Sequence, residues 1–174
     1  MLCVGFASQQ PVIPVTEDWV QVWHNSPMKR AGAKRNILKA SEKLKVGLVT
    51  AGSSQQYPAD YVLFREDGNS VGVYLVCSGK VRMSVRDMPT LDRDFDAGSL
   101  LGLPSTFTGH PYSLTAITVA ESELVHVPRQ QFLELMRERP DFCREATDML
   151  GREVTFIQSA LAERRRQLAL VTAS

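Results

Sequence analysis

Short apolar runs separated by glycine-containing turns fill residues 57–127, and this pattern constrains the fold more than any other feature of the chain. Val81, Met83 and Val85 alternate with polar residues, which is the two-residue period of a strand with one buried face. Gly68 and Gly79 lie in turns, where glycine adopts positive φ at little cost. Such closely spaced runs are typical of a small antiparallel barrel or sandwich. We therefore predict an α+β fold in which residues 55–127 form an antiparallel β-roll of double-stranded β-helix or jelly-roll type.

Helical patterns flank the predicted roll. Apolar residues between positions 37 and 48 predict one helix before it, and Pro128 and Pro140 each begin a helical segment after it. The last segment carries a stripe of apolar residues at spacings of three and four, namely Leu150, Val154, Ile157 and Leu161. If another face of this long C-terminal helix packs on the roll, the stripe needs a second partner, and a two-fold mate is the commonest one. We therefore expect a homodimer with these four residues at its interface.

The pattern divides the chain into three parts. Residues 1–39 form an N-terminal extension that is basic from about position 28, residues 40–139 form the roll with its flanking helices, and residues 140–174 form a dimerisation helix and tail. The basic stretch continues from Lys29 to Lys45. We interpret it as the solvated face of a helix, with a phosphate-contacting arm as the alternative.

Composition excludes several classes of function. The 174 residues carry a net charge of +1, with 44% apolar and 22% charged residues, as in ordinary soluble globular proteins. We expect a cytoplasmic location, because the widely spaced cysteines fit reduced thiols. This balance gives no reason to expect nucleic acid or membrane as a partner, and no apolar run is long enough to span a bilayer. Three distant cysteines and three histidines show no ligand spacing, so we expect neither metal nor cofactor. Catalytic motifs are also absent, and we do not expect an enzyme.

Residues 40–165 resemble the cyclic-nucleotide-binding domain family, in the superfamily of the catabolite activator and fumarate–nitrate regulators. Residues 57–68 read Tyr-Pro-Ala-Asp-Tyr-Val-Leu-Phe-Arg-Glu-Asp-Gly, which is similar to the family's first long strand and turn. Residues 73–81 are similar to its Tyr-x-Ile-x-x-Gly-x-Val pattern, and residues 124–135 to its closing strand and the following helix. The resemblance implies a bacterial regulatory module built on a β-roll.

The resemblance also implies where a nucleotide would bind. In the family a phosphate cassette supplies Gly-Glu-Leu and, about ten residues later, Arg-Ser/Thr-Ala, in which Glu binds the ribose and Arg the cyclic phosphate. Here Gly102-Leu103-Pro104 and Tyr112-Ser113-Leu114 stand in those places, so both charged anchors are missing. We interpret the loop as a vestigial turn filled by leucines. The residues through which it could still bind a ligand are Gly98, Ser99, Leu101, Gly102, Leu103, Tyr112 and Ser113, with Arg82 and Gln158 from elsewhere.

Two classes of function follow from the resemblance. The first is a regulatory or sensor module that does not bind cyclic AMP or cyclic GMP in the usual way and acts through homodimerisation and a partner protein. The second is the sensor half of a DNA-binding transcriptional regulator, or a binder of a small ligand through a non-standard cassette. No helix-turn-helix pattern follows the long helix, which favours the first class.

Overall fold

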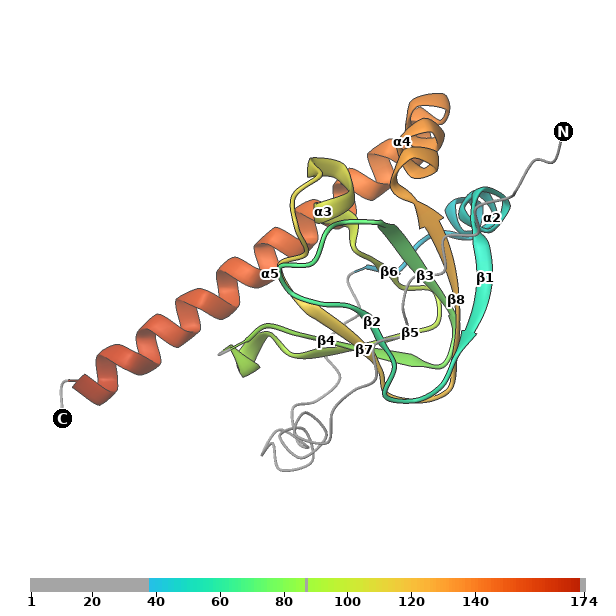
Figure 1. Cartoon of the computed structure of the whole chain (residues 1–174). Coiled ribbons are helices and arrows are strands. Elements are labelled where there is room, and N and C mark those ends of the chain that lie inside the picture. The colour runs from blue at the N-terminus through green and yellow to red at the C-terminus, as the bar shows by residue number, and fades with distance from the viewer. Residues whose placement is uncertain (1–37, 87, 173–174) are drawn as a thin grey trace, which may run out of the picture. The chain divides into compact units, whose positions relative to one another are not determined.

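Two four-stranded antiparallel sheets form the roll in the computed structural model, which describes residues 38–86 and 88–172 (Figure 1). One sheet has the strand order β1-β8-β3-β6 and the other β2-β7-β4-β5. The strands are β1 (Ser53–Tyr57), β2 (Val62–Phe64), β3 (Gly72–Ser78), β4 (Lys80–Ser84), β5 (Arg93–Asp96), β6 (Leu100–Leu101), β7 (Thr115–Thr118) and β8 (Ser122–Pro128). The predicted antiparallel roll is therefore confirmed. The predicted N-terminal extension lies outside the described residues, apart from its last two positions.

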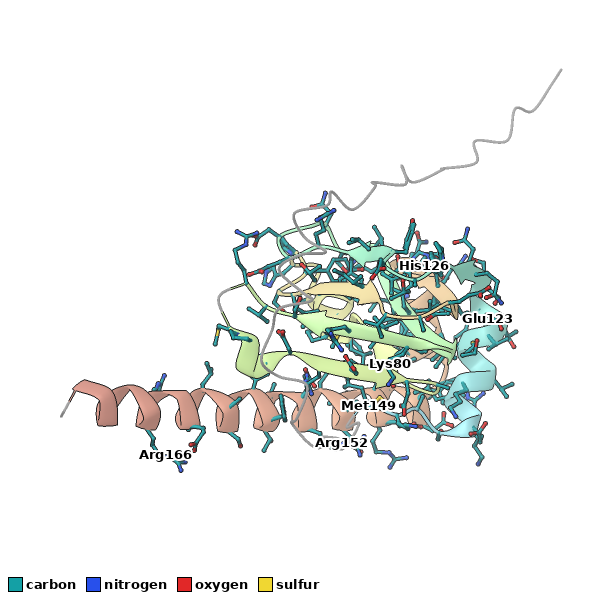
Figure 2. The ribbon with its side chains drawn as sticks, turned by 90° about the horizontal axis from the view of Figure 1, so that it is seen from below. Lys80, Glu123, His126, Met149, Arg152 and Arg166 are labelled. Carbon is teal, nitrogen blue, oxygen red and sulfur yellow. The ribbon has the colours of Figure 1, made fainter. Side chains whose placement is uncertain are left out.

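Helices flank the roll at the predicted places. The helical elements are α2 (Glu42–Ala51), α3 (Leu103–Thr108), the short 3₁₀ helix η1 (Pro89–Leu91), α4 (Arg129–Glu138) and α5 (Pro140–Thr172). Both α2 and α4 pack on β8, and α4 also packs on β3, so they cover one sheet. The far end of α5, which carries Arg166, extends past the roll (Figure 2). No described helix combines the length and the apolar character needed to cross a membrane.

One element differs from the sequence prediction. The segment that we expected to be a leucine-filled turn contains α3, a six-residue helix between β6 and β7. Gly102 precedes it with φ of 83°, and Gly109 ends it with φ of 77° and donates its N–H to the Ser105 carbonyl. A helix this short has fewer than two turns, so no apolar period marks it in the sequence.

The turn between β2 and β3 also differs from the prediction in detail. Gly79 has the expected positive φ of 82°, but in the earlier turn the left-handed residue is Asp67, with φ of 66°, rather than Gly68. Asp tolerates this conformation better than most residues with a side chain. The turn is held by two backbone bonds to one residue: Asp67 N–H donates to Tyr112 O, and Tyr112 N–H donates to Gly68 O, both at 2.8 Å. This contact ties the turn to the end of the cassette.

The start of α5 is fastened to α2. A Cβ atom on Gly47 would lie 2.6 Å from the Phe142 ring, so the missing side chain is what allows this ring to pack on α2. At the first turn of α2, the backbone N–H and the hydroxyl of Ser41 donate to the two carboxylate oxygens of Glu145, at 2.6 and 2.7 Å. Ser41 also caps α2 by accepting from Leu44 N–H at 3.3 Å. These contacts fix α5 against the body of the protein.

Candidate functional site

Four rings, which we call the ring stack, contact one another in series between the two sheets, through two stacked contacts and one tilted contact. Phe64, from the β2 sheet, lies with its ring centroid 4.0 Å from Tyr112 and 5.8 Å from Tyr74, which belongs to the β3 sheet. Tyr74 in turn stacks on His126 of β8 at 4.6 Å. Because Phe64 touches a ring of the opposite sheet, the stack lies inside the roll. Burial raises the pKa values of Tyr74 and Tyr112 and lowers that of His126, so the stack is uncharged at neutral pH.

Tyr112 occupies the cassette position where the resemblance places an arginine. Its side chain is 3% exposed, and its hydroxyl donates to Gly72 O at 2.9 Å and accepts from Val71 N–H at 3.2 Å. Both hydrogen bonds go to the beginning of β3. A phenol in these contacts holds neighbouring backbone in place, but it carries no positive charge for a phosphate.

We predict that the hydroxyl of Tyr112 contributes measurably to stability. Replacing Tyr112 with phenylalanine keeps the stacked ring but removes the hydroxyl that bonds the partly buried Val71 N–H and the buried Gly72 carbonyl. The free energy of unfolding should fall by about 1–2 kcal/mol in urea denaturation. Tyr57→Phe is the matched control, because that hydroxyl bonds only the exposed side chain of Gln55, and it should change stability by less than about 0.5 kcal/mol. Equal effects of the two substitutions would contradict the prediction.

The start of α3 likewise offers no carboxylate that could bind a ribose hydroxyl. Leu103, in the place of the family's glutamate, has no exposed surface, and Pro104 beside it has no N–H. A Cβ atom on Gly102 would meet Gly72 O at 2.9 Å and the Tyr112 ring at 3.3 Å. The structure thus brings together four of the predicted ligand-binding residues among packed apolar atoms, namely Leu101, Gly102, Leu103 and Tyr112.

Of the remaining predicted ligand-binding residues, Ser113 lies beside Tyr112 and the others lie in three further places. Gly98 and Ser99 form the β5–β6 turn, where Gly98 N–H donates to Val76 O and the buried Ser99 hydroxyl donates to Asp96 O. Ser113 is exposed beside Tyr112, and Gln158 is exposed on α5. Arg82 lies on β4 between two buried neighbours, and its guanidinium makes two hydrogen bonds with Asp94, at 2.6 and 2.9 Å. Arg82 is thus paired with an acidic residue of the neighbouring strand, and the contribution of Arg82 and Gln158 to ligand binding stays a prediction.

A buried ion pair that the sequence analysis missed holds α5 against the roll. Arg93 of β5 pairs with Glu153 of α5, and their side chains are only 8% and 6% exposed. The guanidinium also lies 4.0 Å from the centre of the Phe156 ring and 5.0 Å from that of Phe95. Arg93 Nε and Glu153 Oε2 have no hydrogen-bonding partner among the described residues.

The sequence does contain a signal for this pair. Glu153 continues the face of α5 that packs on the roll, at spacings of four, three and four after Phe142, Ala146 and Met149. A carboxylate at an otherwise buried position requires a partner, and a buried arginine is the usual one. Only the fold identifies Arg93 as that arginine.

Comparison with known proteins agrees with the architecture. The family described as the cyclic nucleotide-binding domain matches residues 54–139. Among solved structures, the catabolite activator protein of Thermus thermophilus superposes with a TM-score of 0.53 at 24% identity, covering 76% of this chain and 60% of that one. The c-di-GMP responsive global regulator CLP of Xanthomonas campestris superposes with a TM-score of 0.60 at 17% identity, covering 74% and 65%. At these identities the likeness shows a shared fold.

A curated relative matches over a smaller share of its length. Lysophospholipase nte1 of Neurospora crassa is 25% identical over 144 residues, which cover 80% of this chain but 9% of that protein. The chain thus spans a small part of the curated relative and less than two thirds of the two regulators. The activity in the relative's name is therefore not assigned to this chain.

Proposed function

Residues 54–139 belong to the cyclic nucleotide-binding domain family, and from this premise we propose that the chain is a regulatory module that does not hold cyclic AMP or cyclic GMP in the usual way. It acts through homodimerisation and a partner protein. The observation that carries the proposal is the state of the two anchor positions: Leu103 is fully buried, and Tyr112 is stacked inside the roll with its hydroxyl bonded to backbone.

The chemistry of a cyclic nucleotide supports this reading. A buried phosphodiester keeps its negative charge, and it needs a charge-assisted donor, for which the planar guanidinium of arginine is best suited. Leucine and tyrosine at the two anchor positions supply no charge. Arg82 does not replace the missing arginine, because Asp94 already neutralises it on another part of the roll.

We predict that cyclic AMP and cyclic GMP bind with Kd values above roughly 100 μM, because two charged partners are absent and each is worth a few kcal/mol in a buried site. Isothermal titration calorimetry on the wild-type protein measures this directly. A thermal-shift screen that includes cyclic di-GMP extends the test, since a ligand at a hundredfold excess over its Kd adds about 2.7 kcal/mol to stability. A low-micromolar Kd for either cyclic mononucleotide would refute the proposal.

The homodimer part of the proposal is supported by α5. Its roll-packing face is distinct from the apolar stripe of Leu150, Val154, Ile157 and Leu161, and within that stripe Val154 is 52% exposed. The other three residues are partly buried in the single chain. A second copy related by two-fold symmetry would cover the stripe with an identical stripe.

A second candidate function is the sensor part of a DNA-binding regulator. The observation that favours it is a fold shared with two proteins whose names call them an activator and a global regulator. This chain covers 60% of the first protein and 65% of the second. An electrophoretic mobility assay with duplex DNA tests this candidate. Binding that weakens steeply as the salt concentration rises would support it.

A further inference from the structure

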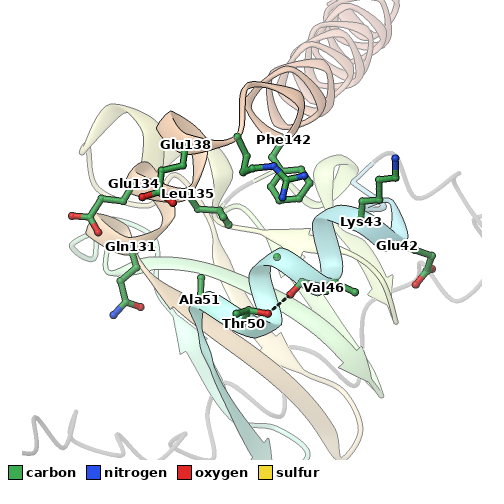
Figure 3. Close-up of a pocket in the computed structure, with 12 residues that line it drawn as sticks. Glu42, Lys43, Val46, Thr50, Ala51, Gln131, Glu134, Leu135, Glu138 and Phe142 are labelled. Carbon is green, nitrogen blue, oxygen red and sulfur yellow. Dashed lines mark hydrogen bonds between the residues drawn. The ribbon is translucent and has the colours of Figure 1, made fainter.

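A groove on the helical side of the roll lies apart from the ring stack and the cassette. It is formed by α2, α4 and the first turn of α5 and has a volume of about 950 Å³ (Figure 3). Its apolar lining consists of Val46, Ala51, Leu135 and Phe142. Val46 is 66% exposed, and Val49, one turn further along α2, is 51% exposed. Two of the three large apolar residues that are exposed in the described part of the chain therefore lie on α2, at or beside this groove.

The groove is held open by contacts that do not depend on a ligand. Phe142 packs on Gly47 of α2, and Ser41 fixes the neighbouring end of α2 to Glu145 of α5. Arg139 stacks on the Phe142 ring at 4.0 Å and bonds the Asp141 carboxylate, so its charge is already neutralised. The helices thus present a formed surface, and binding would not have to pay for ordering it.

The two long walls of the groove differ in chemistry. Glu134 and Glu138 lie together on the α4 wall (Figure 3). The α2 wall carries Val46, Thr50 and Ala51, with Glu42 and Lys43 at its first turn. Carboxylates at positions i and i+4 of a helix repel each other, and a cation placed between them would relieve this repulsion. The α4 wall therefore matches basic side chains, and the part of the α2 wall after its first turn matches apolar side chains.

We propose that this groove binds an amphipathic helix of a partner protein, with its apolar face on Val46 and Leu135 and its basic edge against Glu134 and Glu138. A helix laid in a groove recognises its partner through apolar side chains at positions i, i+3, i+4 and i+7, and charges along one edge set its orientation. This proposal rests on the proposed function in one respect, namely that the module acts through a partner protein. It does not depend on the state of the cassette.

The test uses a fluorescein-labelled helical peptide of 18 residues, with leucines on one face and lysines along one edge, and measures binding by fluorescence anisotropy. We expect saturable binding to the full chain, and a Kd that rises at least about tenfold in Val46→Asp and in the double variant Glu134→Lys/Glu138→Lys. The matched control, Glu121→Lys/Glu163→Lys, makes the same change in net charge at exposed positions away from the groove and should leave the Kd unchanged. Amide hydrogen exchange should slow in α2 and α4 when the peptide binds.

Three results would overturn the proposal. The first is a lack of saturable peptide binding, and the second is an equal loss of binding in the control variant. The third is loss of the wild-type oligomeric state in Val46→Asp, which would mean that a second copy of the chain occupies the groove. Calorimetry with cyclic nucleotides on the same preparation tests the proposed function separately. A protein that binds nucleotide but not the peptide is thereby distinguished from one that binds the peptide but not nucleotide.

Discussion

Replacing Arg93 with alanine should lower the free energy of unfolding by about 3–5 kcal/mol, because the substitution leaves the carboxylate of Glu153 buried without its partner. Glu153 is 4% exposed, and its second oxygen already has no hydrogen-bonding partner among the described residues. Packing of the Arg93 side chain on Phe95 and Phe156 is lost as well. Urea denaturation at fixed protein concentration measures the change, since dimerisation would otherwise alter apparent stability.

Two further variants separate the charge effect from simple truncation. Arg82→Ala removes an arginine from a pair whose side chains are 36% and 37% exposed, and it should cost no more than about 1 kcal/mol. The double variant Arg93→Met/Glu153→Leu replaces both charges with apolar groups and should recover most of the lost stability. If Arg93→Ala costs as little as Arg82→Ala, the pair does not hold α5 on the roll.

The roll and its flanking helices could be predicted because their signals are local. The alternation around Val81 and Met83 and the helix-starting prolines at positions 128 and 140 each need only a few neighbouring residues to be recognised. Helix α3 could not be predicted in this way, because it is shorter than two turns and is defined by glycine conformations at its ends. The turn before β3 differs from the prediction for a similar reason, since its hydrogen bonds join it to Tyr112, which is distant in sequence.

The candidate site was less accessible to sequence reasoning because its contacts join distant segments. The sequence shows that Leu103 and Tyr112 are uncharged, but it does not show that Tyr112 stacks on Phe64 or bonds the backbone of Gly72. Arg93 and Glu153 are 60 positions apart, and neither belongs to a motif. Which cassette residues contact a ligand stays a prediction.

Substituting aspartate for Val154 should weaken the proposed homodimer by a few kcal/mol, or about a hundredfold in Kd, because it places two unpaired carboxylates at a two-fold axis. Val154 is the best position for this test, since its side chain is 52% exposed in the single chain and contributes little to the packing of its own roll. Light scattering at micromolar concentration should give twice the 19.4 kDa protomer mass for the wild type and a mass close to that of one protomer for Val154→Asp.

Ser159→Asp supplies the matched control for this prediction. Ser159 lies five positions further along α5, so it faces away from the stripe, and its hydroxyl donates only to the carbonyl one turn earlier. The control adds the same charge to the same helix and should remain dimeric. A wild type that scatters as one protomer would rule out the dimer at that concentration. A Val154→Asp variant that stays fully dimeric would place the interface elsewhere, because an apolar contact at the axis cannot tolerate two buried and unpaired charges.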